Sequence, residues 1–291
     1  MFKLIKIIIG TIIFLIVSVI IFAVVIIVLN RGNKPKQKQS SFKVENPATF
    51  CLNVNVKDSY VVVKKSKTEY VNISYYESKT RPYDVVESSD GNTLSVTGNQ
   101  IGKWYNRILL TFKFTKVYET TIEIPDDISV IVTTDNGNIR YEDAYASNFS
   151  AITTNGGIIM KNANAGSANL DTVNGHIEIT GTTVGYLNAK TRKGNVSLEN
   201  FTSIGIAYAQ TDKGDIKLTN ITTVGDCKIH TGKGNITGTI RVTEDDYYNI
   251  IAKAVNGTCN LTNKETETAI AYLDVETLNG NIDIAIKKVA L

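Results

Sequence analysis

The chain has 291 residues, 43% of them apolar and 20% charged, which is enough to fold as one large domain or two ordinary ones. Seven of its 31 lysines and arginines fall within residues 1–43, which contain no acidic residue, so 24 basic residues face 28 acidic ones in the remainder. The formal net charge of +3 therefore arises beside the first apolar segment, and the rest of the chain is mildly acidic. This charge distribution excludes a basic nucleic-acid-binding domain, and we expect no nucleic-acid partner.

Residues 1–30 are predicted to be a short cytoplasmic stub and a membrane anchor. Ile7 to Leu29 is an uncharged run of 23 residues. A helix rises about 1.5 Å per residue, so this run is long enough to cross a hydrocarbon core of roughly 30 Å. A cleaved signal peptide has an apolar stretch of only about 7–15 residues followed by a small-residue cleavage site. We therefore expect one retained transmembrane helix, followed by a polar, basic linker over residues 31–43.

Residues 44–124 have the pattern of short strands without a regular repeat. The segments LNVNV, YVVVKK, YVNISYY and NTLSV alternate apolar and polar residues, with turn residues between them. This part of the chain is predicted to be an irregular, β-rich opening of the structure that follows.

Residues 125–291 contain an internal repeat. A glycine preceded by Asn or Lys recurs every 19 to 23 residues, at Gly137, Gly156, Gly175, Gly194, Gly214, Gly234, Gly257 and Gly280. Asn-Gly is a strong turn signal because both residues tolerate positive φ. Ile or Val stands two residues after most of these glycines and Thr three residues before, in the alternation of half-buried strands.

Two architectures fit such a repeat. An antiparallel meander would set Asp171 opposite Glu178, which is a destabilising pair of like charges, and would leave its apolar face uncovered. A parallel solenoid closes its two sheets on each other and stacks like residues on like. We therefore predict an all-β fold: a parallel β-solenoid with two short strands per coil of about 19–23 residues, preceded by the transmembrane helix.

The order of these elements resembles a known family. An anchor is followed by irregular strands, by NTLSV, by TIEIPDDI and then by repeated T-x-[NK]-G-x-[IV] units. Over residues 44–291 this resembles a bacterial family of unknown function that contains membrane-anchored, adhesin-like proteins with β-strand repeats, among them LiaG-like envelope proteins. The resemblance implies a β-solenoid without an established catalytic activity, and it assigns no functional residue.

Three lysines raise the question of a binding site. Lys193, Lys213 and Lys233 occupy the position that Asn fills in the five other units, so a structural turn explains them. With Lys190 and Arg192 nearby, the alternative is a basic stripe that binds an anionic envelope polymer or a lipid headgroup. The sequence leaves both interpretations open.

An enzyme that acts on polysaccharides would need a carboxylate pair, or a base beside a cation, on one outward face. The candidates are Asp171 with Glu178, Asp212 with Asp215, and the lone His176 and His230. The corresponding positions of neighbouring coils hold Lys190, Ser197, Asn195 and Gln210, which indicates an ordinary solvated face. We expect no enzyme, no metal site and no cofactor. Cys51, Cys227 and Cys259 are expected to be free thiols.

The leading hypothesis is a membrane-anchored, non-catalytic solenoid at the cell envelope, an adhesin or surface-binding protein. Its partners would be the membrane, through the helix, and an envelope polymer or another envelope protein. The alternative is a self-associating scaffold that polymerises through the solenoid ends, because the last coil, NGNIDIAIKKVAL, shows little polar cap.

The orientation in the membrane depends on two opposing arguments. Five basic residues follow the apolar run, whereas Lys3, Lys6 and the terminal amine precede it, so the positive-inside rule favours a cytoplasmic solenoid. The anchor at the amino end and the family resemblance favour export, and long downstream domains translocate largely regardless of charge. We therefore predict a single-pass protein of the cell membrane with residues 44–291 outside the cytoplasm.

Overall fold

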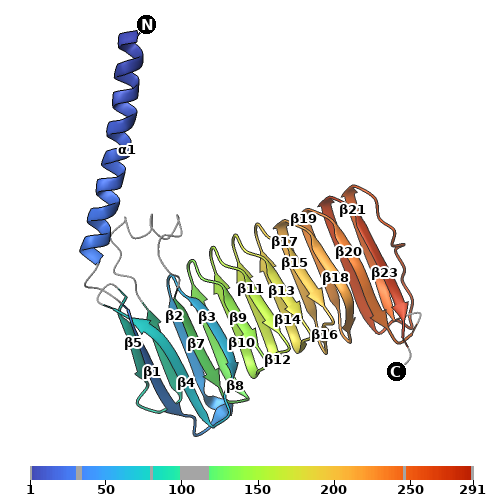
Figure 1. Cartoon of the computed structure of the whole chain (residues 1–291). Helices are drawn as coiled ribbons and strands as arrows, with labels where there is room; N and C mark the ends of the chain where they lie inside the picture. The colour runs from blue at the N-terminus through green and yellow to red at the C-terminus, as the bar shows by residue number, and fades with distance from the viewer. Residues whose placement is uncertain (1, 31–34, 79–80, 99–117, 245–246, 290–291) are drawn as a thin grey trace.

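The computed structural model describes residues 2–30, 35–78, 81–98, 118–244 and 247–289, and it shows a helix followed by a long stack of strands (Figure 1). Helix α1 spans Phe2–Asn30, and the 3-10 helix η1 spans Pro47–Thr49. The first strands are β1 (Lys36–Lys43), β2 (Cys51–Val56), β3 (Tyr60–Lys65), β4 (Tyr70–Glu77), β5 (Tyr83–Glu87), β6 (Thr93–Gly98) and β7 (Glu119–Ile124).

The repeats supply the remaining strands. They are β8 (Ile128–Thr134), β9 (Ile139–Glu142), β10 (Tyr145–Thr153), β11 (Ile158–Lys161), β12 (Asn164–Thr172), β13 (Ile177–Thr180), β14 (Thr183–Thr191), β15 (Val196–Glu199), β16 (Thr202–Ser203), β17 (Ala207–Lys213), β18 (Ile216–Thr223), β19 (Cys227–Lys233), β20 (Ile236–Val242), β21 (Tyr248–Asn256), β22 (Ala271–Asn279) and β23 (Ile282–Lys288).

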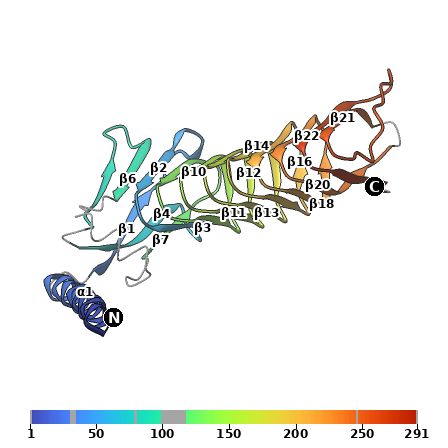
Figure 2. The ribbon, with the colours of Figure 1, turned by 90° about the horizontal axis from the view of Figure 1, so that it is seen from above.

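All of these strands except β16 form two ladders that run side by side along a single axis (Figure 2). The two-residue strand β16 pairs with β14 and with β18. The first sheet has the order β5-β6-β2-β8-β10-β12-β14-β17-β19-β22-β21. The second has the order β1-β4-β7-β3-β9-β11-β13-β15-β18-β20-β23. Neighbours are parallel except at β5–β6, β1–β4 and β4–β7. The predicted parallel solenoid is confirmed, and the meander is wrong.

The predicted inward register is also confirmed. Ile158 pairs with Ile177 and Ile177 with Val196, one coil after another. The same column contains residues that are at most 1% exposed: Ile139, Ile158, Ile177, Val196, Ile216, Ile236 and Ile282. Close packing of this column between the two sheets forms the core of the solenoid.

The recurring glycines are needed for close stacking of the backbone. A Cβ built on Gly156 would lie 1.8 Å from the carbonyl oxygen of Gly137, and one on Gly175 would lie 1.8 Å from that of Gly156. The same approach, within 2.1 Å of a backbone oxygen in the neighbouring coil, is found at Gly137, Gly194, Gly214, Gly234, Gly257 and Gly280. Any side chain would force the coils apart at this point.

Most turns that use positive φ lie elsewhere in the coil, although the recurring glycines Gly234 and Gly280 have φ of 155° and 157°. Asp143, Asn162, Gly181, Asn200 and Asn220 have φ between 48° and 62°, and they follow one another at intervals of 19 or 20 residues. Among the described residues, the asparagines of the Asn-Gly pairs do not adopt positive φ. Our explanation of those pairs as positive-φ turns was therefore wrong for the asparagine, although the position of the turn was right.

Each inward threonine connects two coils. The Thr172 hydroxyl donates to the Gly156 carbonyl of the neighbouring coil at 2.8 Å and accepts from the Gly175 N–H of its own coil at 3.2 Å. Equivalent bonds to the neighbouring carbonyl are made by Thr153, Thr191, Thr211, Thr231 and Thr277. These hydroxyls satisfy a carbonyl that the glycine contact buries.

The coils at the C-terminal end do not follow chain order. Strands β22 and β23 stack on β19 and β20, and the earlier strand β21 lies outermost. Thr277 of β22 donates to the Gly234 carbonyl at 2.9 Å, whereas β21 has Ala254 at this position, which has no hydroxyl to donate. The prediction that NGNIDIAIKKVAL forms the last coil therefore holds for the second sheet, which ends at β23, but it is wrong for the first sheet, where β21 lies outside β22.

The segment over residues 257–268 covers part of the terminal edge. Ile250 and Lys264 exchange two backbone hydrogen bonds, of 2.7 and 3.0 Å, in an antiparallel bridge. The Asn260 side chain accepts from the Ile284 N–H at 3.0 Å and donates to the Ile284 carbonyl at 3.1 Å. A side-chain amide thus occupies backbone groups of β23 that another strand would otherwise pair with.

The N-terminal end is closed by antiparallel strands. Residues 36–43, predicted to belong to the polar linker, form β1, which pairs with β4 from Lys36–Glu77 to Lys43–Tyr70. Lys38 also forms an ion pair with Glu77. An edge strand with several lysines disfavours pairing with another chain. Pairing partners in β4 explain why this polar segment is a strand.

Helix α1 exposes apolar side chains: Phe14 is 70% exposed and Val19 is 66% exposed. The structure describes the exposure of the helix side chains for residues 9–25. Within the described residues, no helix was found with the length and apolar character needed to cross a membrane.

Adjacent glycines provide a test of the stacking contact. We expect Gly156→Ala to lower the free energy of unfolding by more than about 3 kcal/mol, and Gly157→Ala to lower it by less than about 1 kcal/mol. A Cβ on Gly157 would find its nearest atom, the His176 carbonyl oxygen, at 3.3 Å, and not 1.8 Å from backbone as at Gly156. Denaturant unfolding of the full chain in detergent micelles measures both values. Equal losses would show that the close contact is not the reason for the glycine.

Replacement of Asn260 tests the edge cover. Asn260→Ala frees the N–H and carbonyl of Ile284 on an outermost strand, so we expect concentration-dependent association of the full chain in sedimentation equilibrium. The matched control is Asn256→Ala, which removes one surface hydrogen bond of the same terminal coil, the bond to Asn279. If both variants sediment like the native protein, Asn260 does not protect the edge.

Candidate functional site

The structure brings four of the five predicted stripe residues together. Lys213 pairs in register with Lys233, and the adjacent Gly214 rests on Gly194, which places Lys193 in the same column. All three lysines are exposed, as is Arg192 beside them. The column continues with asparagines on both sides, at Asn174 and Asn279, so the turn interpretation and the stripe interpretation describe the same positions.

Lys190 lies on a different surface. It belongs to the outer face of the first sheet, where its neighbours in register are Asp171 and Gln210. Its ammonium group sits 5.1 Å from the centroid of the Tyr208 ring, within the range of a cation–π contact. Hereafter the stripe consists of Arg192, Lys193, Lys213 and Lys233, without Lys190.

A hollow of about 450 Å³ adjoins the stripe. It lies on the outer face of the second sheet, over four consecutive coils, and we call it the groove. Its polar lining consists of His176, Glu178, Asn195, Ser197, Asp215, Lys217, Asn235 and Thr237. Asn195, Asp215 and Asn235 each stand two residues after a stripe lysine, so the stripe lies at the turn that leads into the groove.

Hydrogen bonds between coils fix one wall of the groove. The backbone N–H of Asn195 donates to His176 Nδ1 at 2.9 Å, and that of Asp215 donates to Asn195 Oδ1 at 2.9 Å. The Asn235 N–H donates to Asp215 Oδ1 at 2.7 Å, and the Asn281 N–H donates to Asn235 Oδ1 at 2.9 Å. Each of these side chains is therefore held by the next coil.

The stripe and groove together carry an excess of positive charge. Five cations and three acids lie on this surface: Arg192, Lys193, Lys213, Lys217 and Lys233 against Glu178, Asp212 and Asp215. None of the five cations forms an ion pair with another described residue. Cations that are not neutralised by neighbours remain available to an anionic ligand.

The acids and histidines considered for catalysis are divided between two surfaces: His176, Glu178 and Asp215 line the groove, whereas Asp171 and His230 lie on the first sheet. Asp171 lies on the outer face of the first sheet and Glu178 on that of the second, so they do not form a pair. His230 Nε2 lies 3.2 Å from Asp274 Oδ2 on the first sheet, but without the geometry of a hydrogen bond. Within the described residues, no group of three or more His, Cys, Asp and Glu side chains could hold a metal ion.

The pKa shifts near these residues arise mainly from burial. Burial raises the pKa of the Tyr208 phenol, and the nearby negative charge of Asp274 raises it further. Burial also raises the pKa of the Cys227 thiol to about 12, so this thiol stays protonated at neutral pH and is a poor nucleophile. All three cysteines are free, as expected.

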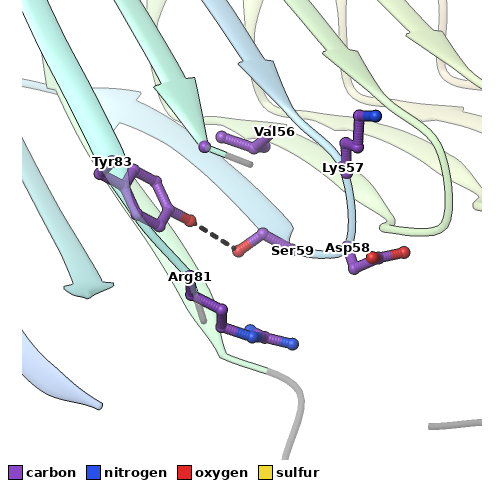
Figure 3. A pocket seen from close by; sticks show the side chains of 7 residues that line it. Val56, Lys57, Asp58, Ser59, Arg81 and Tyr83 are labelled. Atoms are coloured by element: carbon purple, nitrogen blue, oxygen red, sulfur yellow. Dashed lines mark hydrogen bonds between the residues drawn. The ribbon is translucent and has the colours of Figure 1, made fainter. Parts of the chain in front are cut away.

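A second hollow lies at the N-terminal end (Figure 3). The Tyr83 hydroxyl points toward Ser59 and donates to its Oγ at 3.4 Å, and Arg81 and Asp58 also line the space. Its volume of about 10 Å³ admits no more than one water molecule. This hollow is too small to bind a ligand.

Sequence reasoning missed the groove as a site. Asn195, Asp215 and Asn235 form part of a polar column one residue after the recurring glycine, and His176 belongs to the same column. The regular polarity of this position was the available signal. It was not recognised because Asn and Asp next to glycine are also ordinary turn residues.

Comparison with known proteins gives one family. Residues 51–287 match the family model described as Toastrack DUF4097. No curated protein matches the chain.

The chain is similar at low identity to several solved structures. The chain is similar to a putative adhesin from Parabacteroides merdae (12% identity, 86% of this chain and 96% of that chain, TM-score 0.43). It is also similar to a putative adhesin from Bacteroides fragilis (17%, 86% and 97%, TM-score 0.38) and to a putative cell adhesion protein from Clostridium sporogenes (13%, 87% and 100%, TM-score 0.28). Because these TM-scores are below 0.5, we base no argument on the three likenesses.

Proposed function

This chain belongs to the Toastrack DUF4097 family, and we propose that it is a membrane-anchored, non-catalytic solenoid that binds an anionic polymer at the cell envelope. The observation that carries the proposal is the stack of Lys193, Lys213 and Lys233 on consecutive coils. Parallel coils lie about 4.8 Å apart, so the three charges form a row along the solenoid axis. Such a row suits a ligand with many charges, because each weak contact adds to the next.

The proposed anchor is helix α1. Its uncharged run from Ile7 to Leu29 has the length of a membrane span, and the exposed Phe14 and Val19 would find an apolar environment in a bilayer. We place residues 44–291 outside the cytoplasm because the anchor lies at the amino end and long downstream domains translocate largely regardless of charge. An envelope polymer would then be within reach of the stripe.

The proposal of a non-catalytic role rests on where the acids lie. Asp171 and Glu178 lie on two different sheets, so these two carboxylates cannot act on the same bond of a substrate. Asp212 and Asp215 flank Gly214 among the stripe lysines, where they partly offset the repulsion between stacked ammonium groups.

Part of the argument for the alternative scaffold no longer holds. It depended on an uncapped last coil, but residues 257–268 cover part of the C-terminal edge and the lysine-bearing strand β1 ends the second sheet at the other end. We therefore do not propose polymerisation through the solenoid ends.

Charge removal tests the stripe. The variant K193Q/K213Q/K233Q should bind polyphosphate, used as a simple anionic probe, about tenfold or more weakly than the native chain, because each lysine near an anionic ligand contributes on the order of 1 kcal/mol. The matched control is K57Q/K161Q/K253Q, which removes the same charge at exposed positions outside the stripe and groove. Titration of the full chain in detergent micelles at two salt concentrations measures both. Equal weakening in the two variants would contradict a localised site.

Protease digestion tests the orientation. Protease added to intact, wall-stripped cells should remove residues 44–291 and spare a cytoplasmic marker protein. The result is followed with antibodies against the solenoid and against the marker. A solenoid that survives until the membrane is permeabilised would place it in the cytoplasm and overturn the envelope proposal.

A further inference from the structure

We propose that the polymer bound along this surface is a glycan, an anionic chain rich in hydroxyl groups that lies in the groove with its charges on the stripe. This inference rests on the proposed function and adds the ligand class. The ligand class is inferred from the polar side chains of the groove, because the stripe lysines alone would bind any anionic polymer.

The groove presents polar atoms in fixed positions. The Oδ1 atoms of Asn195, Asp215 and Asn235 each accept a backbone N–H of the next coil at 2.7 to 2.9 Å. Among the described residues, the Nδ2 groups of Asn195 and Asn235 donate to no protein atom, although both residues are exposed. Each amide is therefore held in place through its Oδ1 atom, and its Nδ2 group remains available to donate to a ligand. Side chains that are already ordered lose little further freedom on binding.

The outer strand face adds a second row. Glu178, Ser197, Lys217 and Thr237 follow one another in register on β13, β15, β18 and β20. The short side chains of Ser197 and Thr237 alternate with the longer Glu178 and Lys217, which leaves the hollow open between them. The groove thus offers donors and acceptors together: amide N–H groups, hydroxyls and carboxylates.

This mixture favours a glycan over an acidic peptide. Glu178 and Asp215 are acceptors for hydrogen-bond donors of a ligand, and the ionised side chains of an acidic peptide have no donor to offer them. Sugar hydroxyls both donate and accept, so they can satisfy the carboxylates and the amide N–H groups along the same wall. The groove also runs over four coils, which exceeds the reach of a single lipid headgroup.

Three soluble polymers separate these ligand classes: polygalacturonate as the anionic glycan, polyglutamate as the anionic peptide and dextran as the neutral glycan. We expect the full chain in detergent micelles to bind polygalacturonate at least tenfold more tightly than polyglutamate at equal charge concentration, and dextran more weakly than either. Polyglutamate binding as tight as polygalacturonate would overturn the glycan inference and leave the proposed stripe standing.

An isosteric variant tests the groove itself. N195D/N235D keeps the Oδ acceptors for the next coil but removes both exposed amide donors. Its added charge should weaken both anionic polymers, so the decisive quantity is the preference for polygalacturonate over polyglutamate, which should fall close to one. The matched control is N138D/N281D, which makes the same change at two positions of the same column outside the groove and should keep the preference.

The failures are distinguishable. A preference that survives in N195D/N235D would overturn the glycan inference. If neither anionic polymer binds the native chain, or if K193Q/K213Q/K233Q binds both as tightly as the native chain, the proposed function fails, and the glycan inference fails with it.

Discussion

The structure depends on one contact, the approach of a glycine in each coil to a backbone carbonyl of the neighbouring coil. At Gly156 and Gly175 the space that a Cβ would occupy lies 1.8 Å from that oxygen, so only glycine permits the coils to close at this turn. The threonine three residues earlier then satisfies the buried carbonyl, as Thr172 does for Gly156. Because glycine and threonine recur together, each coil fixes the height and the register of the next.

The same contact makes the surface periodic. Once the coils are in register at the glycine, the residue before it and the residue after it must also stack. The first position gives the asparagine and lysine column, in which Asn174 donates to Asn155 and Lys213 stands beside Lys233. The second gives the amide column of the groove, in which the side chain of Asn195 is held by the backbone of Asp215. The repeating surface along the solenoid, to which we propose that a ligand binds, is therefore a direct product of the interaction that stabilises the fold.

The sequence was sufficient to predict the solenoid, its inward columns and the alignment of the stripe, because each is repeated unit by unit around the glycine. It was not sufficient for Lys190, which is close to Lys193 in the chain but lies on the outer face of the first sheet, before the turn that carries the stripe. It also failed for the order of the last coils, because a repeat specifies what each unit looks like and not which unit it follows. The sequence signals for the changed order of the last coils were two local departures from the repeat, at Ala254 and Cys259.

These departures explain how a periodic structure is brought to an end. The hydroxyl of Thr277 in β22 donates a hydrogen bond to the coil on which β22 stacks. Ala254 in β21 has no hydroxyl to donate, so β21 is suited to the outermost place. The chain then uses Asn260 to occupy the edge of β23. At the opposite end, antiparallel pairing of β1 with β4 replaces the parallel stacking. With its edges partly covered in this way, the solenoid presents its repeating polar groups along its sides, and this is where the stripe and the groove lie.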